Sequence, residues 1–553
     1  MDKIWLKSYA PGVPETIDHN DYKSLGDVFE KSADKFRDRP AYSNLGRTLS
    51  YDDVDTMTRD FAAYLTQVAG LKKGDRIAIM MPNLLQYPIA LFAALRAGLI
   101  VVNTNPLYTD RELEHQLNDS GAVAIVILEN FAGTLVSILD KTKVKTIVTT
   151  QIGDLAGFPK SLLVNFVVKY VKKMVPSFSL PSTVVKFNDA LKMGKGKSFS
   201  NADVGHEDVA FLQYTGGTTG VAKGAALTHK NMIANLLQVK AWTVNELSES
   251  NEIFITALPL YHIFSLTANA FSLTLGAKSV LITNPRDMAG FVKELGNEKF
   301  TFMAGVNTLF NGLLNTKGFD QLDFSHVNLF LGGGMAVQES VAEEWKKVTG
   351  HVLIEAYGLT ETSPGVCANP TNNKHFSGNV GLPLSSTEVC VKNEAGDELP
   401  FDEPGELCVK GPQVMQSYWN RPGETSNVMD AEGWLHTGDI AIIDEKGFVK
   451  LVDRLKDLII VSGFNVYPNE IENVVASHPK VLEVGAIGVA HKKSGETVKL
   501  FVVKKDTSLT EDELVNFCRQ QMTGYKCPKH IEFVEDLPKS NVGKVLRKDL
   551  RKL

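Results

Sequence analysis

The sequence predicts an α/β protein with at least two domains, a large N-terminal domain followed by a smaller, mobile C-terminal α+β domain. At 553 residues the chain is longer than one hydrophobic core usually serves. Apolar runs alternate with helix-like stretches over most of the chain, which is typical of a mostly parallel sheet covered by helices. After about residue 378 this alternation gives way to short β-rich pieces with Gly and Pro turns.

Two stretches carry the α/β pattern. In residues 26–150, three apolar runs predict strands with helices between them: GDRIAIMMP, GLIVVNTNP and VAIVIL. From about residue 206, helix-like segments such as THKNMIANLLQV and VQESVAEEWKKV separate further strand-like runs: VAFLQY, EIFITALPL, KSVLIT, FTFMAGV, VNLFLG and HVLIEAY. We therefore expect two α/β subdomains packed together, ending at about residue 378.

The rest of the chain predicts a small β subdomain and a separate C-terminal domain. The pieces STEVCVKNEAGDELP, GELCVKGP and KGFVKLVDR indicate an antiparallel sheet or barrel-like subdomain over about 379–453. Helices are expected near 469–477 and 511–522, and strands near 483–490 and 498–504. The predicted organisation is an N-terminal domain over 1–453, a hinge over 454–459 and an α+β domain over 460–553.

Composition excludes several classes of protein. Hydrophobic residues make up 44% and charged residues 22% of the chain, and the net charge of −6 offers nucleic acid no general attraction. The five cysteines form no C-x-x-C pair, which favours reduced thiols, and the start MDKIWLKSYAPGVPE lacks a signal peptide, so we expect a cytoplasmic protein. Arg96 and Gly98 interrupt the long apolar run at 87–106, which predicts a buried helix and strand rather than a membrane span.

The strongest motif is YTGGTTGVAKGA at residues 214–225. Its glycines, threonines and Lys223 can direct backbone N–H groups, hydroxyls and an ammonium at phosphate oxygens, just before a helix that opens at Thr228. It is not a Walker A loop, because Ala222 precedes the lysine and Gly224 follows it. On these residues alone, a flexible surface loop is the alternative.

Further motifs follow in a fixed order along the chain: LPLYHIF (258–264), GGG (332–334), EAYGLTET (355–362), WLHTGDI (434–440), VDRLKDLIIVSGFNVYPNEIE (452–472) and PKSNVGKVLRK (538–548). With the glycine-rich loop they resemble the acyl-adenylate-forming superfamily, which includes acyl-CoA synthetases, peptide-synthetase adenylation domains and firefly-type luciferases. Within it the chain is most similar to bacterial long-chain fatty acyl-CoA synthetases, through stretches such as MMPNLLQYP, NPLYTDRELEHQLNDSGA and GVNTLFN.

The resemblance implies an ATP-dependent long-chain fatty acid–CoA ligase that uses ATP, Mg²⁺ and CoA. The alternatives are a medium-chain or aryl acid CoA ligase, a luciferase-like enzyme, or a non-catalytic nucleotide- or lipid-binding protein. Retention of Lys223, Glu361, Asp439 and Lys544 argues against the last of these. The oligomeric state stays open between monomer and homodimer.

The resemblance also implies an ATP site. Asp439 would accept hydrogen bonds from two ribose hydroxyls, although a bare T-G-D is equally a turn. Tyr357 and the nearby glycines would hold adenine, Glu361 and Thr219 would bind Mg²⁺, and Arg454 would contact ribose or phosphate, its alternative being an interdomain salt bridge. The full implied ATP-binding set is Tyr214, Thr215, Gly216, Gly217, Thr218, Thr219, Gly220, Lys223, Gly224, Gly333, Gly334, Tyr357, Gly358, Thr360, Asp439 and Arg454.

The implied catalytic residues are Lys544, His262, Thr219 and Glu361. By resemblance Lys544 reaches the carboxylate and the α-phosphate during adenylation; taken alone it would be a solvated lysine in a basic tail. His262 is implied to lie beside the acyl carboxylate or to gate the site, and its alternative is a packed core histidine.

The remaining implied residues serve the acyl chain, CoA and the hinge. The expected acyl-binding set, at strand ends and the helices after them, is His262, Phe264, Ser265, Val306, Phe310 and Leu331. Lys456 is the implied pivot of the hinge, and Ser462, Gly463 and Phe464 are the implied loop beside the pantetheine arm of CoA.

One segment is both basic and apolar. Residues 155–188 contain no acidic residue but five lysines, which accompany LLVNFVVKYVKKMV. This pattern predicts either a helix that touches the inner membrane surface as a peripheral contact, or a buried helix whose lysines cap one end.

Overall fold

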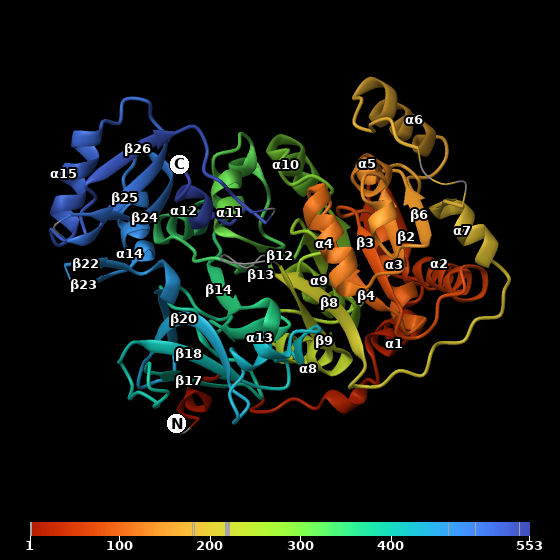
Figure 1. Cartoon of the computed structure of the whole chain (residues 1–553), viewed down its shortest axis with the longest axis horizontal. Coiled ribbons are helices and arrows are strands. Elements are labelled where there is room, and N and C mark those ends of the chain that lie inside the picture. The colour runs from red at the N-terminus through yellow and green to blue at the C-terminus, as the bar shows by residue number, and fades with distance from the viewer. Residues whose placement is uncertain are drawn as a thin grey trace.

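The computed structural model contains four sheets and describes residues 3–179, 181, 183–215, 222–462, 464–492, 494–540 and 542–553. Figure 1 shows the C-terminal part (blue) beside α11 and α12, with the N-terminal helices at the opposite end of the molecule. The α/β class predicted from the sequence is confirmed, because parallel strand pairs form the centre of both large sheets.

The larger sheet has nine strands. Its centre is parallel, and antiparallel pairs close both edges. In spatial order the strands are β16 (Leu382–Pro383), β15 (Gly365–Ala368), β14 (Leu353–Gly358), β13 (Leu329–Gly332), β12 (Phe302–Gly305), β10 (Ile253–Thr256), β11 (Lys278–Leu281), β1 (Pro40–Asn44) and β2 (Arg47–Ser50).

The second sheet has eight strands. In spatial order they are β19 (Ser417–Tyr418), β9 (Lys223–Thr228), β8 (Val209–Thr215), β4 (Ile100–Asn103), β3 (Arg76–Met80), β5 (Ala124–Leu128), β6 (Thr146–Thr150) and β7 (Val185–Lys186). The glycine-rich loop therefore joins two antiparallel strands, β8 and β9, before the helix that Thr228 caps. The helix start is confirmed, whereas the intervening strand β9 was not predicted.

The two large sheets exchange strands along the sequence. β1, from the first α/β stretch, pairs with β11 of the second stretch and carries β2 at its other edge, and β8 of the second stretch pairs with β4 of the first. The expectation of two packed α/β units holds, but a division by sequence stretch is wrong, since hydrophobic periodicity shows where strands lie and not which strands pair.

The two smaller sheets follow in the chain. Over the described residues the predicted barrel-like piece is an open antiparallel sheet of β17 (Glu388–Lys392), β18 (Gly405–Lys410), β20 (Leu435–Ile443) and β21 (Val449–Arg454). The last sheet draws only on residues after 458: β22 (Ile459–Val461), β23 (Phe464–Val466), β24 (Val481–His491), β25 (Gly495–Lys504) and β26 (His530–Val534).

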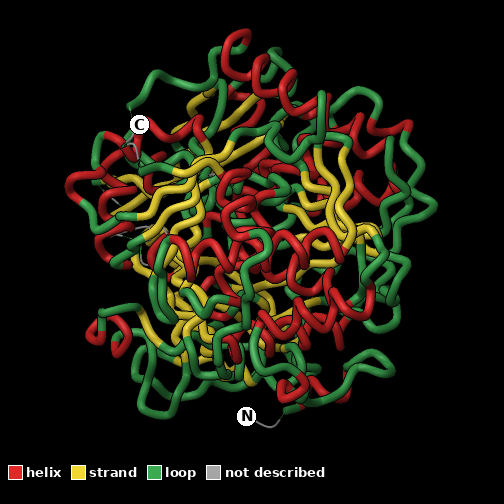
Figure 2. Tube along the Cα trace, turned by 90° about the vertical axis from the view of Figure 1, so that its right-hand side faces the viewer, coloured by secondary structure: helices red, strands yellow, loops and turns green. Residues whose placement is uncertain are grey.

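Helices lie between the two large sheets. In Figure 2 helices (red) lie between two groups of strands (yellow). The helices are α1 (Leu25–Phe36), α2 (Tyr51–Ala63), α3 (Gln86–Arg96), α4 (Asp110–Ser120), α5 (Ala132–Val136), α6 (Lys160–Phe166), α7 (Phe187–Gly194), α8 (His229–Trp242), α9 (Ile263–Thr274), α10 (Met288–Gly296), α11 (Asn307–Leu314), α12 (Glu339–Thr349), α13 (Pro422–Ser426), α14 (Pro468–Ala476), α15 (Glu511–Gln521) and α16 (Arg547–Leu550).

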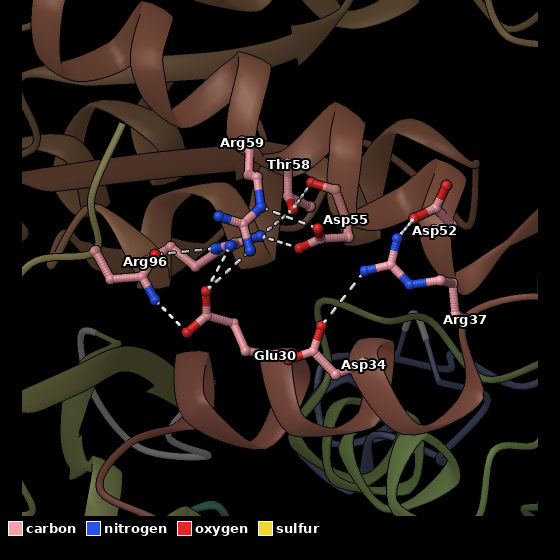
Figure 3. A network of polar contacts seen from close by, with 9 residues as sticks. Glu30, Asp34, Arg37, Asp52, Asp55, Thr58, Arg59 and Arg96 are labelled. Atoms are coloured by element: carbon pink, nitrogen blue, oxygen red, sulfur yellow. Dashed lines mark hydrogen bonds and ion pairs between the residues drawn. The ribbon is translucent and has the colours of Figure 1, made fainter. Parts of the chain in front are cut away.

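Arg96, which interrupts the apolar run at 87–106, ties three helices together (Figure 3). Its side chain is fully buried at the end of α3, where it pairs with Glu30 of α1 at 2.6 Å and with Asp55 of α2 at 2.7 Å. It also donates to Thr58 at 2.8 Å. Two carboxylates and a hydroxyl compensate the cost of burying the guanidinium, so loss of either partner would leave an uncompensated charge in the core.

The predicted buried helix and strand at 87–106 are confirmed as α3 and β4. Among the described residues, no helix has both the length and the apolar character needed to cross a membrane.

Candidate active site

A cavity of about 1230 Å³ opens where the carboxyl ends of β12, β13 and β14 meet the C-terminal part of the chain. Open α/β sheets characteristically bind ligands at this edge. Many of the predicted residues line the cavity, including His262, Gly333, Tyr357, Asp439 and Lys544. Segments almost 300 residues apart in sequence thus meet around one space.

Asp439 is held by two neighbours. It lies on β20 opposite Arg454 of β21, whose Nε is 3.0 Å from Asp439 Oδ1. The Tyr357 hydroxyl donates to Asp439 Oδ2 at 2.7 Å, and burial followed by the charge of Asp439 raises the pKa of Tyr357 far above its ordinary value. Tyr357 therefore stays a protonated donor, and the carboxylate is fixed with its orientation set from both sides.

Glycines beside Tyr357 remove side chains from the cavity wall. A Cβ at Gly333 would lie 3.1 Å from the ring of Phe264, and a Cβ at Gly358 would lie 2.1 Å from the carbonyl oxygen of Pro364. Gly334 has a φ of +77°, which favours glycine. Glycine at Gly333 and Gly358 therefore allows neighbouring segments of the protein to pack closely, and the predicted contact of this backbone with adenine stays a prediction.

The two ends of the glycine-rich loop are described, but Gly216, Gly217, Thr218, Thr219 and Gly220 lie outside the described residues. Tyr214 and Thr215 end β8, and Lys223 and Gly224 begin β9. The Tyr214 hydroxyl donates to Asp119 at 2.7 Å. A Cβ at Gly224 would lie 3.0 Å from the Tyr214 ring, so only glycine fits without displacing that ring.

Lys223 and Glu361 approach each other across Tyr418. The ammonium of Lys223 pairs with Glu424 and lies 5.1 Å from the centre of the Tyr418 ring. The Tyr418 hydroxyl donates to Glu361 Oε1 at 2.7 Å. Glu361 and its neighbour Thr360 belong to a short 3₁₀ turn, η8 (Thr360–Thr362), at the cavity wall.

Lys544 reaches the cavity from the end of the chain and is half-buried there. Burial, and then the positive charge of Arg454, lower its pKa to about 8, although Asp439 opposes the shift. The adjacent turn is docked onto α11, where the Thr308 hydroxyl donates to the carbonyl of Gly543 at 3.0 Å. An ammonium held at the cavity wall in this way is a local source of positive potential.

His262 caps α9 and faces the same space. Its Nδ1 accepts a long hydrogen bond, 3.4 Å, from the backbone N–H of Phe264. Burial, followed by the nearby charge of Lys544, lowers the pKa of His262 to about 4. The imidazole is therefore neutral near pH 7, and it contributes a polar donor or acceptor rather than a second cation.

The predicted acyl-binding residues divide into two groups. His262, Phe264, Val306 and Leu331 line the cavity. Ser265 instead donates to the carbonyl of Leu258 at 2.7 Å. Phe310 is fully buried against Trp345, with 4.7 Å between ring centres, and it does not line the cavity.

The predicted hinge residue lines the cavity, whereas the described residues of the predicted CoA loop do not. Lys456, in the 3₁₀ turn η9 (Leu455–Asp457), lines the cavity, and burial lowers its pKa. Ser462 and Phe464 do not line it: the N–H of Ser462 donates to Ser494, and the Phe464 ring stacks on Tyr525 at 4.8 Å. Gly463 lies outside the described residues.

Both models of the AMP-binding enzyme family match this sequence. The AMP-binding enzyme model matches residues 29–419, and the model of the AMP-binding enzyme C-terminal domain matches residues 470–544. The chain belongs to the AMP-binding enzyme family.

Relatives of this AMP-binding enzyme extend over its whole length. It is 57% identical to a long-chain-fatty-acid–CoA ligase of Escherichia coli O6:H1, over 100% of this chain and 98% of that protein. The crystal structure of ATP-bound MatB from Rhodopseudomonas palustris matches with a TM-score of 0.80 at 29% identity, over 96% of this chain and 98% of that one. The anthranilate CoA ligase AuaEII in complex with anthranoyl-AMP matches with a TM-score of 0.86 at 23% identity, over 97% and 98%, which shows the shared fold.

Three further polar groups of this AMP-binding enzyme were not predicted as site residues, although Glu355 and Arg547 lie within the motifs at 355–362 and 538–548. Tyr418 bridges Lys223 and Glu361, as described above. Glu355 lines the cavity with one oxygen lacking a partner among the described residues, and burial raises its pKa to about 8. Arg547 is bonded to Asp453 at 3.0 Å and to Glu472 at 2.8 Å, next to the hinge. Each depends on contacts between distant segments, and a single sequence carries no signal for such contacts.

Proposed function

We propose that this enzyme is a long-chain-fatty-acid–CoA ligase that converts ATP, a fatty acid and CoA into AMP, pyrophosphate and fatty acyl-CoA. The observation that carries the proposal is the convergence of Lys544, His262 and Asp439 on one cavity that continues along the apolar wall of Phe264, Val306 and Leu331. Full-length identity of 57% to a ligase of this name supports the choice of substrate class.

In the proposed first step, a carboxylate oxygen of the fatty acid attacks the α-phosphorus of ATP, and pyrophosphate leaves. Lys544 supplies positive charge where the carboxylate and the phosphate meet, and neutral His262 orients the carboxylate without competing for its charge. Asp439 receives the ribose hydroxyls and Tyr357 fixes that carboxylate. The protein mainly positions reactants and balances charge, as phosphoryl transfer requires.

In the proposed second step, the thiol of CoA attacks the acyl carbonyl carbon. The new C–S bond replaces the bond between the acyl carbon and the phosphate oxygen, so AMP leaves. The C-terminal domain, 460–553, rotates about Lys456, which removes Lys544 from the cavity and brings the 462–464 loop toward the pantetheine arm. The separation of Ser462 and Phe464 from the cavity in this structure supports two working positions of that domain.

Mg²⁺ is part of the proposal. Glu361 lines the cavity, and among the described residues its carboxylate accepts one side-chain hydrogen bond, from Tyr418, so it retains acceptor capacity for a hard cation. Together with Thr219 it would hold the ion, which would neutralise charge on the phosphates of ATP. We also include a cytoplasmic location, which the five buried free thiols support.

Glu361→Gln is expected to raise the Mg²⁺ concentration needed for half-maximal adenylation by at least about tenfold, because the amide loses the charge that a hard cation favours. The measurement is a Mg²⁺ titration of pyrophosphate release. Glu343→Gln, which changes an exposed carboxylate of α12, is the matched control and should titrate like the parent. Identical titrations for Glu361→Gln and the parent would remove Glu361 from the metal site.

The adenylation rate is expected to fall as the pH rises through about 8, the pKa of Lys544 in the free enzyme. The lysine carries its charge below this pKa and loses it above, so kcat/KM for pyrophosphate exchange should decline on the alkaline side. The residual activity of Lys544→Ala should not show this decline at alkaline pH. An alkaline limb of the same midpoint in Lys544→Ala would assign the titration to another group.

The substrate class is tested by pyrophosphate release with fatty acids from about C6 to about C20 and with aryl acids, each with and without CoA. We expect the highest kcat/KM for long saturated chains, and CoA thioester as the product. Faster turnover of aryl or short-chain acids would reassign the enzyme within the family. No pyrophosphate release with any acid would contradict the adenylation mechanism itself.

A further inference from the structure

A short helical arm projects from the edge of the eight-stranded sheet, between β6 and β7. It comprises residues 157–174: α6, the π-helical turn Val167–Val171 that continues it, and the flanking loops. In Figure 1 it stands at the upper right, beyond α5 and β6. We call these residues the arm.

The arm is anchored to the body through polar contacts at its base. Asn165 accepts from the N–H of Gly153 at 2.7 Å and donates to Asp154 at 3.1 Å. At the far end, Asn130 donates to the carbonyl of Met174 at 3.1 Å. No residue of α6 or the following turn is buried, so the prediction of a buried helix is wrong. The amide-bearing side faces the protein, and the opposite side faces solvent.

The solvent side of the arm is apolar. It holds seven of the fifteen large hydrophobic side chains that are exposed among the described residues, and each of the seven is more than half exposed: Phe158, Leu162, Leu163, Phe166, Tyr170, Val171 and Met174. Phe158 reaches 86%. Leu162, Phe166 and Tyr170 recur every four residues and thus share one helical face. Apolar patches of this density on a soluble surface normally mark a binding site.

All charged residues within the arm itself are lysines. Residues 155–188 contain no Asp or Glu, in a chain whose net charge is −6. Lys169, Lys172 and Lys173 are exposed and cluster at the end of the helical part of the arm. Lys160, at its start, donates to the carbonyl of Leu45. The surface of the arm therefore combines exposed apolar side chains with a local positive charge, although the net charge of the whole chain is negative.

We propose that the arm docks the enzyme onto a bilayer surface containing anionic phospholipid. Its apolar face enters the boundary between headgroups and acyl chains, and its lysines meet the lipid phosphates. At 12 residues, α6 and its π-helical continuation are too short to span a bilayer, which leaves an in-plane position. A bilayer surface containing anionic lipid offers phosphates for the lysines of the arm and an acyl region for its exposed apolar side chains, so it matches both features of the arm together. If the proposed function is also correct, docking would bring the site to a phase in which long-chain fatty acids concentrate.

The test is co-sedimentation of the full chain with vesicles of phosphatidylglycerol and phosphatidylethanolamine, and with vesicles of phosphatidylcholine alone. We expect binding to the anionic vesicles, weaker binding to the neutral ones, and progressive release from the anionic vesicles as salt is raised. K172E/K173E should weaken binding to the anionic vesicles by at least about tenfold. L163S/F166S should weaken it to a similar or greater extent.

Matched controls separate the arm from total charge and total hydrophobicity. K143E/K145E makes the same change in charge at two exposed lysines just before β6, at the strand end away from the arm. Val244→Ser removes an apolar side chain that is 52% exposed elsewhere. Both controls should bind vesicles like the parent. All variants should keep the parental melting temperature and, without vesicles, the parental rate of pyrophosphate exchange.

Several outcomes would overturn the proposal. One is equal vesicle binding by the parent and both arm variants; another is parental binding that ignores lipid charge and salt. A third is sedimentation velocity showing a dimer that the arm variants dissociate, which would make the arm a contact between copies. The salt dependence of the unmodified protein decides the question even if an arm variant fails to fold. Vesicle binding is measured without turnover, so a failure of the docking proposal can be distinguished from a failure of the proposed ligase activity.

Discussion

Lys544→Ala is expected to slow adenylate formation by about 10²–10³-fold while leaving thioester formation from supplied acyl-adenylate within a few fold of the parent. The reason is that the ammonium faces developing charge only while pyrophosphate departs. In this structure Lys544 is half-buried and lines the same cavity as His262 and Asp439, and its pKa is lowered to about 8, so its charge acts on groups bound in that cavity. Pyrophosphate exchange measures the first step, and CoA thioester formed from acyl-adenylate measures the second.

Lys552→Ala is the control for loss of a tail lysine, because Lys552 is largely exposed and pairs with Asp549, three residues earlier in the chain. It should behave like the parent in both assays. Equal losses in both half-reactions of Lys544→Ala would mean that the lysine supports the fold or both steps alike, and the assigned role would be wrong.

Lys456→Pro is expected to preserve the first half-reaction and to slow the second, as locking the C-terminal domain in its present position would. Proline fixes φ at the proposed pivot. With the chain held as it stands here, Lys544 remains in the cavity, and pyrophosphate exchange should persist within a few fold. Thioester formation should fall by about 100-fold, because the 462–464 loop cannot reach the acyl-adenylate.

Lys456→Ala is the matched control, since it removes the same cavity-lining side chain and leaves the backbone free to rotate. It should retain thioester formation far better than Lys456→Pro does. A melting temperature equal to that of the parent would show that the proline has not unfolded the linker. A folded Lys456→Pro enzyme that makes acyl-CoA at the parental rate would exclude rotation about this residue.

Local pattern predicted most of the strands and helices but not how the sheets are assembled. The runs that contain β3, β8 and β14 stand out as short apolar segments bounded by turns, and their burial explains why. The antiparallel return through β9 was missed because Lys223–Thr228 is mostly small residues without strand alternation. Exchange of β1 and β8 between the large sheets depends on pairing across long stretches of chain, which composition does not encode.

The site residues, like the fold, could be predicted only in part. The positions of Asp439, Glu361 and Lys544 in motifs allowed them to be named by resemblance, although a single aspartate in a turn or a single lysine in a basic tail has no distinctive local chemistry. Tyr418 lies in none of the quoted motifs, and Arg547 lies in one without being assigned a role. Both act through residues distant in sequence: Tyr418 bonds to Glu361, 57 residues away, and Arg547 to Asp453, 94 residues away. From the sequence, Arg96 was identified only as a break in an apolar run. Its structural role depends on the two carboxylates that the fold places beside it.

The measurement that tests the account most directly is a single-turnover, rapid-quench experiment with excess enzyme, ATP and palmitate, analysed by mass spectrometry before and after CoA is added. The account predicts palmitoyl-AMP and pyrophosphate without CoA, followed by loss of palmitoyl-AMP in step with the appearance of palmitoyl-CoA and AMP. Palmitoyl-CoA formed together with ADP and phosphate, or formed without a palmitoyl-AMP that is consumed at a competent rate, would contradict it.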